Sequence, residues 1–165
     1  MIGVADSSPL IILAKLGFFA TLHKLYSRVY ISSEVHHEVV VAGAGLPGAQ
    51  EVADSQWIEM KSVQDQPGLL TAHKKFSLGM GELSTILLGK ELRPDELLLD
   101  DYNARQMAKK EGFRVRGSVG LLELFYRKGY LTDLRAAFQQ LFTHKVYVDR
   151  QLLEHRLRVL NLPPL

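Results

Sequence analysis

The chain has 165 residues, a net charge of +2, 47 % hydrophobic residues and no cysteine. The composition excludes disulfides and any zinc site or nucleophile that depends on cysteine. We expect residues 1–165 to form one domain, with the C-terminal helices from about residue 131 packed on it as an appendage. Without a long apolar run or a signal-peptide pattern, we also expect a cytoplasmic protein with no membrane partner.

Short apolar segments alternate with segments of helical spacing along the chain. The apolar segments predict strands at 2–5, 28–31, 57–63, 97–99 and 113–116. Helices are predicted after most of them, including one at 18–26 and one at 134–141 capped by Thr132, with a turn at 65–68. This alternation predicts an α/β fold, a three-layer α/β/α sandwich around a mainly parallel sheet.

Carboxylates follow two of the predicted strands. The first strand ends at Asp6, and the strand at 97–99 ends at Asp100 and Asp101, just before a predicted helix. In open α/β sheets, ligands bind outside the carboxyl ends of the parallel strands. The alternative is that Asp100 or Asp101 only caps the helix that follows.

Two glutamates on predicted helices could overhang the same edge of the sheet. Glu38 shares a helix face with Glu34, four residues earlier, and Glu82 lies at the border of an apolar helical stripe. Brought together with the strand-end aspartates, they would repel one another and favour a bound cation. Oxygen ligands without cysteine indicate Mg²⁺ or Mn²⁺, and a site of this kind hydrolyses phosphodiesters. Solvated glutamates and scattered structural acids remain the alternative.

Other motifs do not lead to a site. His36 and His37 lack the spacing of an HExxH zinc motif, and Gly79 and Gly81 do not complete a dinucleotide fingerprint. Basic residues concentrate in the second half of the chain, where they could position RNA or form an ordinary solvated surface: Lys109, Lys110, Arg114, Arg116, Arg127, Lys128, Arg150, Arg156 and Arg158.

Five stretches in register resemble the PIN domain nucleases, in particular the predicted nucleic-acid-binding PIN proteins of prokaryotes. They are Ala5-Asp6-Ser7-Ser8-Pro9-Leu10-Ile11, Ser33-Glu34-Val35-His36-His37-Glu38-Val39, Gly81-Glu82-Leu83-Ser84-Thr85-Ile86, Leu98-Leu99-Asp100-Asp101-Tyr102-Asn103-Ala104-Arg105 and Gly117-Ser118-Val119-Gly120.

The resemblance implies metal-dependent cleavage of single-stranded RNA, often by the toxin of a toxin–antitoxin pair. By position, Asp6 matches the first acid of the family, Glu38 the second and Glu82 the third. The fourth falls on Asp100 or Asp101, because this chain has Leu-Asp-Asp where the family commonly has Thr-x-Asp. We expect Mg²⁺ or Mn²⁺ as the cofactor, and an antitoxin protein and a second copy of the chain as partners.

Three further residues are candidates for substrate contact or support. Ser7 and Ser118 could bond a metal-bound water or a phosphate, or only cap helices. Arg105 lies four residues beyond Asp101 and could pair with that acid or meet a substrate phosphate, and we slightly favour a role in orienting the acid cluster.

Two rival functions keep the fold without catalysis. One is a nucleic-acid-binding module in which the acids are structural. The other is a regulatory interaction protein that docks through Phe18, Phe19, Leu22 and Leu25, although burial of these residues in the core is the preferred interpretation.

Overall fold

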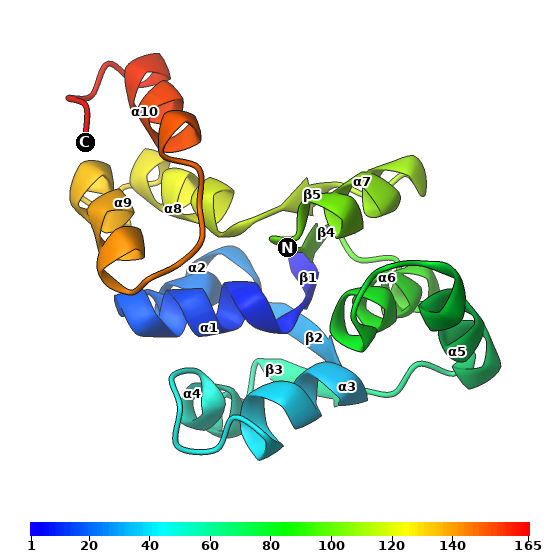
Figure 1. Cartoon of the computed structure of the whole chain (residues 1–165). Coiled ribbons are helices and arrows are strands. Elements are labelled where there is room, and N and C mark those ends of the chain that lie inside the picture. Colours follow the sequence, from blue (N-terminus) through cyan, green and yellow to red (C-terminus); the bar gives the residue numbers. More distant parts are fainter.

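The structure is a computed structural model that describes residues 1–165, and its centre is one five-stranded sheet. The strand order is β3-β2-β1-β4-β5, and every neighbouring pair is parallel (Figure 1). The strands are β1 (Ile2–Ala5), β2 (Arg28–Ser32), β3 (Ile58–Lys61), β4 (Glu96–Leu98) and β5 (Val115–Arg116). The prediction of an α/β sandwich with a mainly parallel sheet is confirmed.

Helices connect the strands and cover both faces of the sheet. They are α1 (Ser7–Leu16), α2 (Leu22–Leu25), α3 (Ser33–His36), α4 (Ala49–Asp54), α5 (Gln66–Lys75), α6 (Met80–Leu92), α7 (Tyr102–Lys110), α8 (Ser118–Arg127), α9 (Leu134–Thr143) and α10 (Arg150–Val159). A 3-10 turn, η1 (Phe19–Thr21), precedes α2, and a turn of π-helix, η2 (His37–Val41), follows α3. No single helix is long and apolar enough to cross a membrane; only the pair formed by α1 and residues 19–25, bent by 118°, passes such a test.

Three local predictions were wrong in detail. The single helix predicted at 18–26 is divided into η1 and α2. The predicted turn at 65–68 is the start of α5, because Asp65 caps the helix by accepting a hydrogen bond from the Gly68 backbone and Pro67 fits the first turn. Asp133, not Thr132, caps α9 by accepting from the Ala136 backbone.

The two faces of the sheet have hydrophobic layers of unequal size. Leu98 of β4 belongs to a cluster of 24 buried residues, to which α1, α8, α9 and α10 also contribute. Leu97 and Leu99 point to the other face and join a cluster of 8 buried residues with α6 and α7. Phe19 and Leu22 lie in the larger cluster, so the preferred interpretation of core burial holds for them and they supply no docking surface.

The C-terminal helix is fastened to the larger layer by a buried ion pair. The guanidinium of Arg156 on α10 donates to both carboxylate oxygens of Glu123 on α8, at 2.6 Å each, and Glu123 is buried. Arg127, one turn along α8, also donates to Glu123. Of the basic residues that could position RNA, Arg156 is therefore engaged in holding α10 in place, and Arg127 is engaged in a pair within α8.

The order of strands reverses between β1 and β4. From β1 the chain builds outward through β2 and β3, and then crosses to β4 and β5 on the other side of β1. Ala5 and Leu98 are partners in the register, and the backbone N–H of Asp6 donates to the carbonyl of Leu98. The acids that follow these two strands are therefore brought to the point where such sheets bind ligands.

Candidate active site

Asp6 stands at the centre of the candidate site. It follows β1 and is only 4 % exposed, and no cation pairs with it. The pKa of Asp6 is raised to about 7, chiefly because burial disfavours the charged form and in part because of the charges of Glu82, Glu38 and Asp100, while a backbone hydrogen bond at Ser7 acts in the other direction. A buried carboxylate that is costly to ionise, beside three other acids, is a site that a cation would stabilise.

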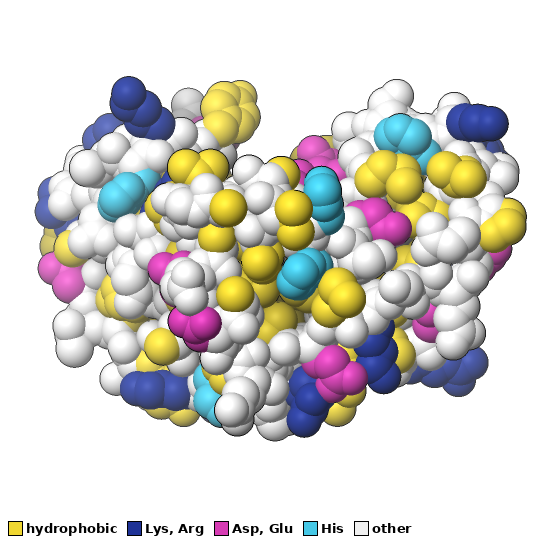
Figure 2. Space-filling view, turned by 90° about the horizontal axis from the view of Figure 1, so that it is seen from below, with side chains coloured by type: hydrophobic (Ala, Val, Ile, Leu, Met, Phe, Trp, Pro, Cys, Tyr) yellow, Lys and Arg dark blue, Asp and Glu magenta, His cyan; other side chains and the backbone are white.

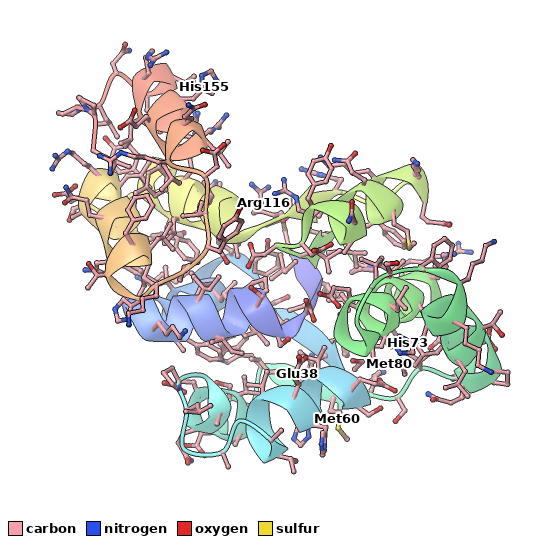
Figure 3. The ribbon with its side chains drawn as sticks, in the orientation of Figure 1. Glu38, Met60, His73, Met80, Arg116 and His155 are labelled. Atoms are coloured by element: carbon pink, nitrogen blue, oxygen red, sulfur yellow. The ribbon has the colours of Figure 1, made fainter.

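Glu38 reaches the site from η2. Its Oε2 accepts a 2.7 Å hydrogen bond from the hydroxyl of Ser7 at the start of α1, while the same hydroxyl lies 3.4 Å from Oδ1 of Asp6. Since one hydroxyl proton serves both acids, the shorter contact to Glu38 leaves Asp6 weakly bonded. Glu38 extends from the α3–η2 segment toward α1 and is exposed to solvent (Figure 3). Turns of π-helix are common at functional sites.

Asp100 and Asp101 have different roles, although they are adjacent. The Asp100 carboxylate accepts the Ser118 backbone N–H at 2.6 Å, the Ser118 hydroxyl at 2.7 Å and the Ser8 hydroxyl at 2.9 Å. Asp101 is exposed and caps α7, accepting the Ala104 backbone N–H at 2.8 Å. The geometry therefore places Asp100 with Asp6, whereas Asp101 has the capping role considered as an alternative.

Two glycines let backbone pass close to the carboxylates. A β-carbon on Gly81, near the start of α6, would lie 2.8 Å from Oδ1 of Asp6 and 3.0 Å from Oε2 of Glu38. A β-carbon on Gly117, just before α8, would lie 2.9 Å from Oδ1 of Asp100. Because real side chains do not tolerate such approaches, both positions favour glycine while the acids keep these positions.

Glu82 reaches the site from the first turn of α6. Its carboxylate folds back toward Gly79 at the N-terminus of α6, with Oε2 2.5 Å from the position of a Gly79 β-carbon. Its charge still raises the pKa of Asp6, so it belongs to the same electrostatic cluster. The Glu82 carboxylate is also stabilised by the dipole of α6, because it lies near the N-terminus of that helix.

Two hollows meet at Glu82. One, of about 490 Å³, lies between α3–η2 and the start of α6 and includes Glu38 and His37 in its lining. The other, of about 600 Å³, includes Asp6 and Asp100 and extends to the segment between α9 and α10. In the space-filling view the outline of the molecule is notched between two raised parts, with acidic and histidine side chains beside the notch (Figure 2).

Arg105 does not make the ion pair expected of it. No carboxylate lies within 4.0 Å of its guanidinium, although it lines the larger hollow with Asp100. Its Nη1 lies 3.4 Å from the position of a Gly117 β-carbon, beside the Asp100 carboxylate. The pair with Asp101 is absent, because Asp101 accepts a hydrogen bond from the backbone of α7, and Arg105 lies beside Asp100 instead.

The donor set fits a hard divalent cation by its chemistry. No three His, Asp or Glu side chains converge closely enough to ligate a single ion directly. Mg²⁺, however, keeps several waters and is usually held by one or two carboxylates, so four oxygen-donor acids around one rim suit such an ion. None of Asp6, Glu38, Glu82 and Asp100 is neutralised by an ion pair.

The larger hollow contains residues that the sequence analysis passed over. Ser8 bonds Asp100, and Tyr102 and Tyr147 line the hollow with large exposed side chains. Ser8 could have been found, since a serine pair directly after a strand-end acid offers two hydroxyls to the same edge. Tyr147 carried no signal, because only the three-dimensional path of the α9–α10 segment brings it there.

Fold and site together define an all-parallel α/β/α protein with a cluster of unpaired carboxylates where its strand order reverses. The sequence matches the family DUF3368, described as a PIN domain, over residues 2–162, so the chain belongs to the PIN domain family. PIN domains are generally nucleases. A solved structure of similar fold is a PilT N-terminus domain protein from the hyperthermophilic archaeon Sulfolobus solfataricus P2, with 18 % identity and a TM-score of 0.51, covering 72 % of this chain and 87 % of that one. A search of curated proteins finds no match.

Proposed function

We propose that the protein is an Mg²⁺- or Mn²⁺-dependent endoribonuclease that hydrolyses phosphodiester bonds of single-stranded RNA. The observation that carries the proposal is the buried Asp6 carboxylate, which has no cationic partner and faces the charges of Glu38, Glu82 and Asp100 at the switch point of a PIN fold. In this proposal these four acids hold the metal, and Asp101 serves the fold by capping α7.

In this proposal the residues of the site have separate roles in catalysis. A bound divalent ion supplies Lewis-acid stabilisation of the phosphate and lowers the pKa of water. Ser7 orients Glu38, while Ser8 and Ser118 hold Asp100 in one position through their hydrogen bonds. Arg105, with no carboxylate partner, is placed to bind a phosphate of the substrate.

The biological setting we propose is that of a cytoplasmic toxin held by an antitoxin protein, acting as a homodimer. This part rests on the family alone, in which such pairs are frequent. It predicts that co-expression with the product of a neighbouring small gene abolishes both growth inhibition and RNA cleavage. Sedimentation equilibrium of the purified chain would test the dimer.

A second candidate is a nucleic-acid-binding module without catalysis. It is favoured by one observation, that no three ligands converge on a single point. In such a module Asp6 would be partly protonated near neutral pH and the cluster would be structural. We prefer the nuclease, because structural acids usually acquire ion pairs, as Glu96 and Glu123 do here.

The test compares Asp6→Asn with wild type and with Asp54→Asn, a surface acid on α4 whose carboxylate accepts a hydrogen bond from the Gln50 side chain. Each protein is incubated with labelled single-stranded RNA and Mn²⁺ or EDTA, and metal binding is followed by calorimetry. We expect metal-dependent cleavage by wild type and Asp54→Asn, and a loss of about 100-fold or more in Asp6→Asn with its fold intact. Equal cleavage by Asp6→Asn, or no binding of Mn²⁺ by wild type, would sink the proposal.

A further inference from the structure

The most exposed aromatic side chains of the chain gather at the candidate site. Tyr147 is 103 % exposed and Tyr102 is 72 % exposed, whereas the next aromatic residues, Phe76 and Tyr130, reach only 39 % and 37 %. Both of the first two line the same cavity of about 600 Å³ as Asp6 and Asp100. Two large aromatic faces exposed to water in the same cavity as the candidate carboxylates are suited to stacking on a flat ligand.

This cavity has two chemically different ends. Its polar end contains carboxylates, hydroxyls and one cation, Arg105. Its other end is formed by the segment that joins α9 to α10 and by its neighbours. It is apolar except for Asp149, whose carboxylate caps α10. The apolar residues there are Leu141, Val146, Tyr147, Val148 and Leu152. A nucleotide has the same division, with an anionic phosphate and a flat apolar base face.

The residues of the apolar end pack against the large core cluster. Leu141 is buried in the large core cluster, and Val146 and Val148 pack against that cluster. The buried pair of Arg156 with Glu123 fixes α10, which follows the segment. In Figure 1 the link between α9 and α10 bows out from the C-terminal helices toward the sheet. The α9–α10 segment is therefore a fixed wall of the cavity, and the Tyr147 ring projects from this wall.

We propose that this wall is a base-binding subsite, in which the base of one unpaired nucleotide stacks on Tyr147 while its phosphate lies at the carboxylate end. Tyr102, at the start of α7, offers a second stacking face to a neighbouring base. This rests on the proposed nuclease function and deepens it, because it assigns the preference for single strands to two residues. In a duplex the base faces are covered by their neighbours and cannot reach the rings, and aromatic stacking binds every base with little sequence preference.

Binding is measured with Ca²⁺ in place of Mn²⁺, so that the carboxylate end carries a divalent charge to accept the phosphate, and gels of the same samples check for cleavage separately. Fluorescence anisotropy at low salt would compare wild type with Tyr147→Ala, Tyr147→Phe and Tyr102→Ala, and Tyr130→Ala serves as the matched control because Tyr130 is exposed but outside the cavity. The RNAs are a short single strand, the same strand with abasic residues, and a duplex of equal length. Since Tyr147 is fully exposed, its replacement does not disturb the core.

We expect Tyr147→Ala to weaken binding of the single strand about tenfold and Tyr102→Ala by a smaller factor, because stacking of one base is worth about one to two powers of ten in affinity. Tyr147→Phe and Tyr130→Ala should bind like wild type, and the abasic strand should bind Tyr147→Ala and wild type equally. The subsite is overturned if Tyr147→Ala binds the single strand as wild type does, if wild type prefers the duplex or the abasic strand, or if wild type binds no RNA.

The two proposals fail separately. RNA binding that depends on Tyr147, without cleavage when Mn²⁺ is added, would leave the base subsite standing and refute the nuclease. Cleavage by Tyr147→Ala at wild-type rate and affinity would leave the nuclease standing and refute the subsite.

Discussion

Ser118 holds Asp100 through two hydrogen bonds, one from its backbone N–H at 2.6 Å and one from its hydroxyl at 2.7 Å. The first residue of α8 thereby fixes the carboxylate that follows β4. Ser8, at the start of α1, adds a third bond at 2.9 Å. The starts of two helices thus determine which of two adjacent aspartates faces the site.

The first prediction separates these aspartates. Asp100→Asn should lower metal-dependent cleavage about 100-fold or more, because one of the four acids at the rim is lost. Asp101→Ala should keep the activity but lower the free energy of unfolding by about 1 kcal/mol, since only the cap of α7 is removed. Cleavage assays and urea unfolding of both variants check this, and the reverse result would assign the fourth site position to Asp101.

The second prediction concerns the pH dependence of stability in the absence of metal. The pKa of Asp6 is raised from 3.8 to about 7, so its contribution to stability is fully present below 3.8 and is lost as the pH rises through about 7. Asp6→Asn, which cannot ionise, should therefore be more stable than wild type at pH 8 by as much as a few kcal/mol, with the difference shrinking toward pH 4. Thermal unfolding in EDTA across this range measures it.

Metal ions provide the control for that measurement. Added Mn²⁺ should raise the melting temperature of wild type at pH 8 and leave that of Asp6→Asn nearly unchanged, because binding to the native state stabilises it. A wild-type stability that does not fall between pH 4 and pH 8 relative to Asp6→Asn would contradict the raised pKa.

The third prediction tests the close approach at Gly81. Alanine is favoured over glycine in a helix by about 1 kcal/mol, but here its β-carbon would meet Asp6 and Glu38 and displace their carboxylates. Gly81→Ala should therefore keep or slightly raise the melting temperature while it weakens Mn²⁺ binding and cleavage about tenfold.

Gly89 on the same helix is the matched comparison. Its added β-carbon would lie 2.8 Å from the Leu97 side chain in the small core cluster, far from any acid of the site. Gly89→Ala should lower stability and leave Mn²⁺ affinity unchanged. If both alanine variants lose stability and keep metal affinity, the carboxylates do not depend on the gap at Gly81.

The fold could be predicted from the sequence because its pattern is local and repeated. Three leucines at 97–99 between polar residues indicate a buried strand, and they point alternately to the two hydrophobic layers. The long apolar segment after Gly17 was less clear. An apolar run with no glycine, proline or charged residue at a break does not show where a helix is interrupted. The chain forms two separate elements there, η1 and α2.

The acids of the site could be predicted from the sequence, but the orientation of their carboxylates could not. The order of strands brings Asp6 and Asp100 together, and this order follows from general rules for parallel sheets. The orientation of each carboxylate depends on hydrogen bonds from residues distant in sequence, such as Ser118 to Asp100. For the same reason Arg105 could not be assigned, because its expected partner Asp101 is occupied by a backbone N–H.

The basic residues show this limit most clearly. Arg116 was grouped with the basic residues that could position RNA or form a solvated surface, yet it pairs with Glu96, which no local pattern distinguished from an ordinary polar residue before a strand. The pair depends on the register of β4 and β5, in which Leu98 faces Arg116. Figure 3 shows Arg116 where β5 passes into α8.

The last prediction concerns this pair. Glu96 is 2 % exposed and accepts hydrogen bonds from Arg116 at 2.6 and 2.9 Å and from the Tyr26 hydroxyl at 2.5 Å. Burial by itself raises the pKa of Glu96, but the hydrogen bonds from Arg116 and Tyr26 and the charges of Arg116 and Arg114 outweigh it and hold the pKa below its ordinary value of 4.5. Its contribution to stability is therefore present above 4.5 and is lost as the pH falls through the lowered value, the opposite direction to Asp6.

Glu96→Gln should accordingly lower the free energy of unfolding at pH 7 by about 1–3 kcal/mol, less than for a fully buried pair because Arg116 is partly exposed. The difference from wild type should shrink as the pH falls below 4.5. Glu59→Gln removes the exposed partner of Arg28 and should change stability by less than about 1 kcal/mol at any pH. Equal effects of the two substitutions in urea unfolding at pH 7 would mean that burial adds nothing to the Glu96 pair, and that β4 is held to β5 by its backbone alone.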